Sequence, residues 1–232
     1  MELNEKQQFL LDKLNELPPA LEEITGIIEK GEYSSNDISR IGAAFIDDYC
    51  VDFDTSDPNS YIRIEPQAPY VYDIVKLLLE HGLDPNAVYG ATNIMSDLLF
   101  VSTPYVAADT LALLLEHGGS MDLIVDGVRI FDDLDFDISF DAFNQEIRSS
   151  YDSTVHCWFV MLGYGARLRD GSLPVDLFDI YDEDYTHKEP FDISLLKNHQ
   201  NYTFGISNVP SRGENWSLHI FDKRTFFEVA RL

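Results

Sequence analysis

Six histidines and two cysteines are the side chains of this sequence best suited to act as nucleophiles, bases or metal ligands. They are His81, His117, His156, His187, His199 and His219, with Cys50 and Cys157. Only His156 and Cys157 are adjacent. Adjacent side chains on a helix diverge, whereas a Cys–His nucleophile pair must converge and helical metal ligands recur at three or four residues. We therefore expect both to pack in a core, with no catalytic or metal-binding role.

A run of alternating aspartates, Asp133-Leu-Asp-Phe-Asp137, resembles the start of a calcium loop. An EF-hand also needs glycine at its sixth position and glutamate at its twelfth, where this chain has Ile138 and Asn144. The alternation instead predicts an extended segment with one apolar face and a ridge of acids, which serves either solvation or docking of Lys/Arg. The candidate partner-binding residues here are Asp132, Asp133, Asp135, Asp137 and Asp141.

A second acidic stretch, residues 181–185, places tyrosines around carboxylates. Aromatic anchors among acids suit a basic partner, although a segment that packs its tyrosines against the fold fits equally well. The candidate partner-binding residues here are Tyr181, Asp182, Glu183, Asp184 and Tyr185. Acids occur throughout the chain and no catalytic pair is singled out, so we expect no enzyme, no cofactor and no metal.

The charge of the chain limits its partners. The 232 residues include 16 Lys+Arg and 41 Asp+Glu, a formal net charge of −25, and 45% of them are hydrophobic, enough for a sizeable core. Such a chain repels phosphate backbones and anionic membrane surfaces. A basic protein partner remains favourable, as does plain solubility.

Location is expected to be cytoplasmic. No apolar run approaches the roughly 20 residues of a membrane span, and the polar stretch 1–8 lacks the pattern of a secretory signal. The two cysteines lie far apart, so we expect both to be reduced and buried.

An internal repeat organises the first two thirds of the chain. Leu-Leu-Leu-Glu-His-Gly occurs at 77–82 and again at 113–118, and the surrounding segments 73–86 and 109–122 align. Decayed copies fall at 155–168 and at 20–31. Each copy predicts an apolar helix that stops at a glycine, with histidine in the last turn of the two clear copies near the terminal carbonyls.

Residues 74–86 resemble the second helix of the ankyrin repeat, whose pattern runs Val/Ile-Val-x-x-Leu-Leu-x-x-Gly-Ala-Asp-x-Asn. The resemblance implies stacked helix–turn–helix units joined by protruding fingers, which hold other proteins through exposed finger and first-helix residues. The first-helix signature Thr-Pro-Leu-His is absent, so the repeats are divergent.

The expected fold is mainly α, an ankyrin-like repeat stack with a small C-terminal antiparallel β-sheet cap. Residues 1–170 form about four helix pairs, and residues 171–232 form an acidic linker and the cap packed on the stack. The helix pairs are 5–14 with 20–29, 36–48 with 70–81, 93–101 with 106–117, and 139–146 with 153–162. The strands are 202–206, 216–221 and 225–230, the last two joined as a hairpin.

These features favour a non-enzymatic protein-binding module with an acidic recognition surface. The resemblance and the charge together suggest a bacterial immunity protein that neutralises a basic toxin. The alternatives are an inhibitor that mimics nucleic acid, an enzyme with a site between the stack and the C-terminal sheet, and a scaffold.

Overall fold

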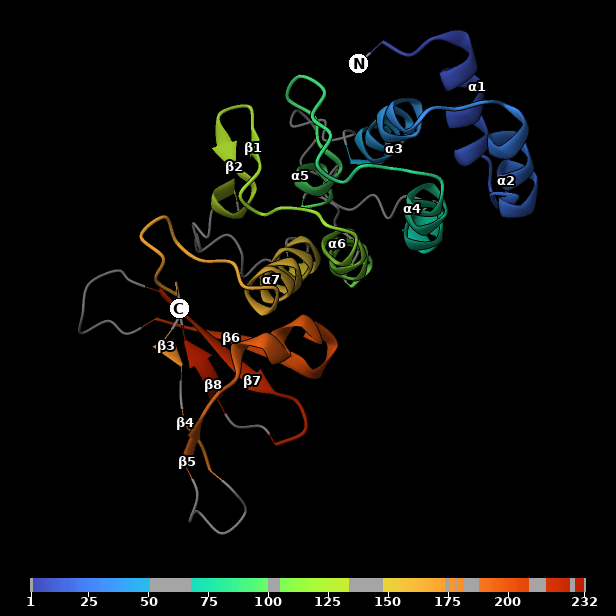
Figure 1. The fold of residues 1–232 in the computed structure, drawn as a ribbon. Coiled ribbons are helices and arrows are strands. Elements are labelled where there is room, and N and C mark those ends of the chain that lie inside the picture. Colours follow the sequence, from blue (N-terminus) through green and yellow to red (C-terminus); the bar gives the residue numbers. More distant parts are fainter. Residues whose placement is uncertain are drawn as a thin grey trace. The chain divides into compact units, whose positions relative to one another are not determined.

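The fold is mainly helical with small antiparallel sheets (Figure 1). The computed structural model describes residues 2–50, 68–99, 105–133, 148–173, 176–177, 179–181, 188–208, 216–225 and 228–231. It divides into two compact units, Met1–Cys157 and Trp158–Leu232. This division falls within a helix, earlier than the boundary expected after residue 170.

The helices lie close to where the sequence predicts them. They are α1 (Glu5–Leu14), α2 (Leu21–Lys30), α3 (Ser35–Cys50), α4 (Val71–Glu80), α5 (Ile94–Leu98), α6 (Val106–Glu116) and α7 (Arg148–Gly163). Helix α5 is shorter than the expected 93–101, and the expected helix 139–146 lies outside the described residues. Among the described helices, none has the length and apolar character needed to cross a bilayer.

The first six helices pack as consecutive hairpins. Helix α1 packs on α2, α3 on α4 and α5 on α6, as the expected pairing requires. The hairpins also contact one another: α1, α3 and α5 follow each other in one row, and α2, α4 and α6 in a second (Figure 1). The two clear copies of the repeat therefore lie in neighbouring helices, α4 and α6.

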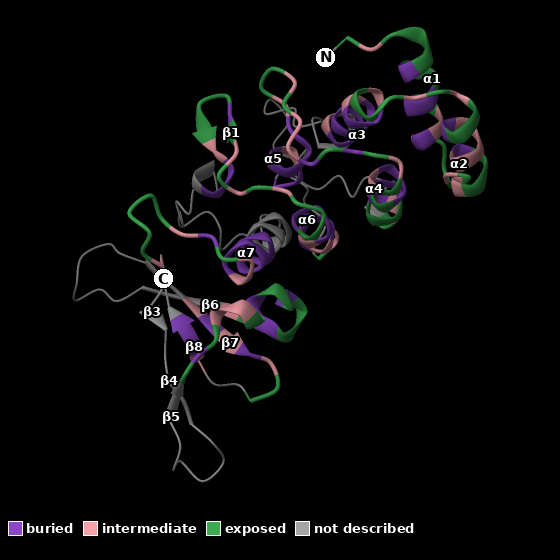
Figure 2. Cartoon of the chain, in the orientation of Figure 1, coloured by how far each residue is buried: buried purple, intermediate pink, exposed green. Residues whose placement is uncertain are grey.

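Both repeated helices bury the same face. Leu78 in α4 and Leu114 in α6, which are equivalent in the repeat, are fully buried, and so are the equivalent Val75 and Leu111 one turn earlier. Figure 2 colours the buried parts of both helices purple. Apolar residues at helical spacing produce this broad stripe, and its burial is the main force that holds the hairpins together.

The C-terminal unit contains a four-stranded antiparallel sheet in the order β3-β8-β7-β6. Its strands are β3 (Asp176–Leu177), β6 (Tyr202–Asn208), β7 (Trp216–Asp222) and β8 (Glu228–Arg231). The pairing of β7 with β8 confirms the expected hairpin, and β6 pairs with β7. That this sheet caps the repeats stays a prediction.

Part of the expected acidic linker also forms strands. Besides β3, the short strands β4 (Asp179–Tyr181) and β5 (Lys188–Pro190) pair with each other in a separate antiparallel ribbon. Strands of two or three residues are too short to show an alternating pattern, so the sequence did not reveal them.

Candidate binding surface

The helices of the repeat end in the same way. Gly82, Gly118 and Gly165 all have positive φ, at 94°, 91° and 97°. The residue after each glycine donates its amide to a carbonyl five residues back, at 2.9, 3.0 and 2.9 Å, in the pairs Leu83–Leu78, Gly119–Leu114 and Ala166–Met161. This is the Schellman arrangement, and it confirms that the copy at 155–168 ends its helix as the two clear copies do.

The two histidines of the repeat complete the helix ends. His81 Nδ1 lies 2.8 Å from the Leu77 carbonyl oxygen, and His117 Nδ1 lies 2.8 Å from that of Leu113. A carbonyl oxygen only accepts, so Nδ1 donates in both cases. Both side chains therefore cap their helices, as the sequence predicts.

The copy at 20–31 ends differently. Gly31 keeps a right-handed conformation with φ −85°, and the left-handed position falls one residue later, on Glu32 with φ 54°. The alignment of Gly31 with Gly82 is therefore wrong by one position. A non-glycine residue takes the strained conformation here.

The loop after α4, residues 83–92, is the first finger. A bridge between Tyr89 and Thr92 closes its tip. Asn93 is buried at its base, where Nδ2 donates to the carbonyls of Pro85 and Ala87, both at 2.9 Å, while Oδ1 accepts from the Met95 amide and caps α5. These bonds fix the finger to the start of the next helix.

Tyr89 fixes the first finger a second time, against α3. Its hydroxyl lies 3.2 Å from the carbonyl oxygen of Asn36, and its ring lies 5.4 Å from the Arg40 guanidinium. The Arg40 Nη2 donates to the carbonyl of Glu2 at 2.8 Å. The Arg40 guanidinium that faces the Tyr89 ring is therefore also held by a backbone carbonyl.

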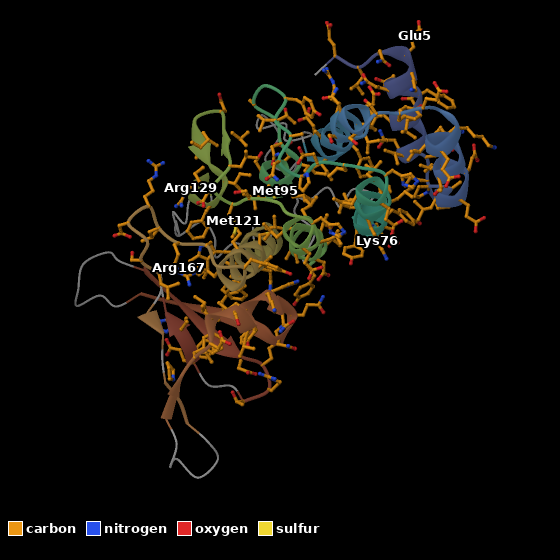
Figure 3. The ribbon with its side chains drawn as sticks, in the orientation of Figure 1. Glu5, Lys76, Met95, Met121, Arg129 and Arg167 are labelled. Atoms are coloured by element: carbon orange, nitrogen blue, oxygen red, sulfur yellow. The ribbon has the colours of Figure 1, made fainter. Side chains whose placement is uncertain are left out.

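The loop after α6, residues 119–129, is the second finger. It is a β-hairpin of β1 (Ile124–Val125) and β2 (Val128–Arg129). Asp126 and Gly127 turn it with φ 47° and 83°, the two positive values that a type I′ turn requires. Arg129, at the base of the hairpin in Figure 3, donates to Asp122 at 3.1 Å. Sequence reasoning missed this hairpin, although Asp-Gly between apolar residues is its usual signal.

One side chain joins the two fingers. Asn86 of the first finger donates through Nδ2 to the carbonyl of Gly118 at 2.9 Å, and its Oδ1 accepts from the amide of Ser120 at 2.8 Å. Both fingers project from the same side of the helix rows (Figure 1). The amide of Asn86 thereby sets the register between them.

Together the fingers expose apolar side chains among carboxylates. We term this set the finger surface; it comprises Val88, Ile124 and Val128 with Asp84, Asp122 and Asp126. Ile124 is 63% exposed and Val128 is 40% exposed, high values for residues of this type. Arg129 is the one cationic residue within the two fingers, and it is paired with Asp122. The surface thus combines exposed apolar area with negative charge.

Three of the candidates chosen from the sequence are described by the structure, and these lie outside the two fingers. Asp132 and Asp133 fall in a 3-10 turn, Ile130–Asp133, so the expected extended segment does not include Asp133. Tyr181 ends β4 opposite Lys188 of β5. Seven other candidates lie outside the described residues and stay predictions: Asp135, Asp137, Asp141, Asp182, Glu183, Asp184 and Tyr185.

The adjacent His156 and Cys157 are both buried in α7. Burial raises the pKa of the Cys157 thiol to about 12, so it stays protonated at neutral pH and is a poor nucleophile. The His156 ring packs on Tyr105 at 4.8 Å between centroids. Both residues therefore have the core role that the sequence predicts.

Few other groups that could bind a metal or react are found in the part of the chain that the structure describes. There, no group of three or more His, Cys, Asp or Glu side chains could hold a metal ion. His219 Nδ1 lies 2.8 Å from Glu228 across β7 and β8, and His199 is buried.

No protein-family model, curated protein or solved structure matches the chain.

Proposed function

We propose that this chain is a non-enzymatic protein-binding module, built from ankyrin-like helical repeats, that holds a basic protein on its finger surface. The observation that supports this most directly is the pair of fingers joined by Asn86, which present Ile124 and Val128 to solvent among Asp84, Asp122 and Asp126. An exposed apolar patch with a charged rim is typical of a protein interface.

The apolar side chains supply the affinity. Ile124 and Val128 would each contribute about 1–2 kcal/mol of binding free energy if a partner buried them fully. Both stand on a closed hairpin with a defined turn, so little further ordering is needed when a partner docks. A few well-buried residues usually carry most of the binding free energy of an interface.

The carboxylates supply the choice of partner. The whole chain carries a net charge of −25, and the finger cation Arg129 is already paired. A basic protein is therefore attracted from a distance, which raises its association rate at low salt. An acidic partner or a nucleic acid is repelled by the same field.

The narrower proposal is that the partner is a bacterial toxin and that the chain is its immunity protein. Its support is the acidic charge together with the resemblance of residues 74–86 to an ankyrin repeat. A toxin that acts on nucleic acid needs a basic face to hold phosphates, and an acidic module can cover that face. Binding to the finger surface would then inhibit the toxin.

Copurification from the native cell tests the proposal. A basic protein should be recovered, and its affinity should fall as salt is raised. The double variant Ile124→Ser with Val128→Ser should weaken binding by about tenfold or more, since two exposed anchors are lost. Asp122→Asn with Asp126→Asn should mainly slow association.

A matched control is Leu195→Ser, which removes an exposed leucine from the C-terminal unit. It should leave binding unchanged. Recovery of an acidic partner, or undiminished binding by the Ile124 and Val128 variant, would contradict the proposal.

A further inference from the structure

The first helical hairpin exposes a second apolar surface, separate from the fingers. Phe9 of α1 is 50% exposed, and Leu17, in the connection to α2, is 48% exposed. In α2, Gly26 and Ile27 are half-buried. We term these four residues the hairpin seam.

An ion pair shows how the seam is assembled. Lys13 Nζ of α1 lies 2.7 Å from Glu16 and 3.5 Å from Glu23 of α2, so Lys13 and Glu23 face each other across the hairpin. Phe9 lies one turn from Lys13 on the same side of α1, and Ile27 lies one turn from Glu23 on the same side of α2. Phe9 and Ile27 thus flank the line along which the two helices meet, and Gly26, three residues from Glu23, lies beside it on α2.

Gly26 indicates that something can approach this line closely. It lies in the middle of α2, where glycine weakens a helix, and a side chain at this position would meet no atom of the residues that the structure describes within 4 Å. Gly42 in α3 differs, because a side chain there would collide with Leu83. No contact among the described residues therefore accounts for the glycine at 26, whereas a second helix could lie against the bare backbone.

The charge around the seam favours a cationic occupant. Residues 2–32 include eight acidic residues and three lysines. Lys13 is held by Glu16 and Glu23, and Lys6 Nζ donates to the Glu32 carbonyl at 2.8 Å and stands over the Tyr33 ring. Exposed acids line both helices: Glu5 (labelled in Figure 3), Asp12, Glu22, Glu23 and Glu29. A second copy of this chain would bring the same negative charge and be repelled.

We infer that a basic amphipathic helix of a partner protein binds along the hairpin seam. Its apolar side covers Phe9, Leu17 and Ile27, its backbone approaches Gly26, and its Lys or Arg side chains face the acids on either side. Helix-in-groove recognition uses this combination of spaced apolar anchors and flanking charge. The site shares no residue with the finger surface, so it goes beyond the function proposed above and does not depend on it.

The test uses a synthetic helical peptide of leucine and lysine, with all leucines on one face, and a scrambled peptide of the same composition. Peptide affinity for the full chain is measured by fluorescence titration. The amphipathic peptide should bind about tenfold more tightly than the scrambled one, the factor expected from one well-buried apolar anchor. Phe9→Ser with Leu17→Ser should abolish this difference, and Gly26→Gln should reduce it by obstructing the approach.

The control is Tyr72→Ser, which removes an exposed aromatic residue from α4 and should leave the difference intact. Ile124→Ser with Val128→Ser should also leave it intact, which separates this inference from the finger surface. Equal binding of both peptides, or a difference that survives Phe9→Ser with Leu17→Ser, would overturn the inference. A dimer that dissociates in this double variant would also overturn it, since a second copy would then occupy the seam.

Discussion

The two fingers follow almost identical helix ends yet are built by different means. The first is fixed at its base by Asn93 and against α3 by Tyr89. The second is a β-hairpin with its own turn at Asp126 and Gly127 and one ion pair at its base. The shared helix ends hold both loops in the same place, while the contents of the loops differ.

The difference shows which half of the repeat is constrained. The leucines and the terminal glycine of each copy must fit the neighbouring hairpins. They therefore recur in both clear copies of the repeat. A finger needs a fixed base and leaves its tip free to vary. Exposed residues such as Ile124 therefore belong to the half of the repeat that is free to vary.

The largest expected effect tests the shared half. Leu78→Ala and Leu114→Ala each remove a fully buried side chain at equivalent positions, so each should lower the free energy of unfolding by about 2–5 kcal/mol. Urea denaturation measures both values. Lys76→Ala, on the exposed side of α4 (Figure 3), is the control and should change stability by less than about 0.5 kcal/mol. Widely different costs for the two leucines would contradict their equivalence.

The next effect separates the bases of the two fingers. Asn93→Ala removes the α5 cap and the donors to two carbonyls at a buried position, so it should cost about 2–3 kcal/mol. Asp122→Ala removes one partner of an ion pair from an exposed position and should cost less than about 1 kcal/mol. Urea denaturation of both variants checks the ranking. Similar costs would show that the second finger depends on its base as much as the first does.

A smaller effect compares the two glycines that end α4 and α6. Gly82→Ala and Gly118→Ala should each cost about 1–2 kcal/mol, because alanine resists positive φ. The cost should be greater at Gly82, where the new methyl group would stand 2.7 Å from Ser35 Oγ, whereas at Gly118 it would enter open space. Thermal and urea unfolding measure the difference. A greater cost at Gly118 would contradict the described packing.

The smallest effect concerns Tyr89, which has no counterpart in the second finger. Tyr89→Phe should cost at most about 1 kcal/mol at neutral pH, since it removes long hydrogen bonds to Asn36. Burial, the largest cause, raises the pKa of Tyr89 above its ordinary 10.0. The neutral phenol is therefore favoured in the folded state, and its contribution is present below pH 10 and lost as pH rises through the raised pKa. Stability measured against pH should fall less steeply above pH 10 in the variant than in the unchanged chain.

The sequence predicts the parts of this fold that depend on local pattern. Leucines at helical spacing and a glycine after histidine identify α4, α6 and their ends, and runs rich in aromatic and apolar residues identify β6, β7 and β8. The roles of Asn86 and Asn93 were not predicted. Asn86 bonds to Gly118 and Ser120, more than thirty residues away, and no local pattern encodes such a contact.

The residues of the proposed binding surface were harder to predict than the fold. Acidic density directed attention to 132–141 and 181–185, because charge is visible in a sequence and exposure is not. Whether Ile124 is exposed depends on which side of the hairpin faces the helices, and this follows from tertiary packing. Asp126-Gly127 is the local signal that would have located the hairpin.

The turn at Asp126 and Gly127 has a consequence for the binding proposed for the second finger. Because both residues already hold the required backbone angles in a paired ribbon, the second finger has little conformational entropy left to lose. Engineering that stiffens this loop would therefore gain little affinity. Tighter complexes should come from side chains that extend the contact area, and the gain should appear as slower dissociation.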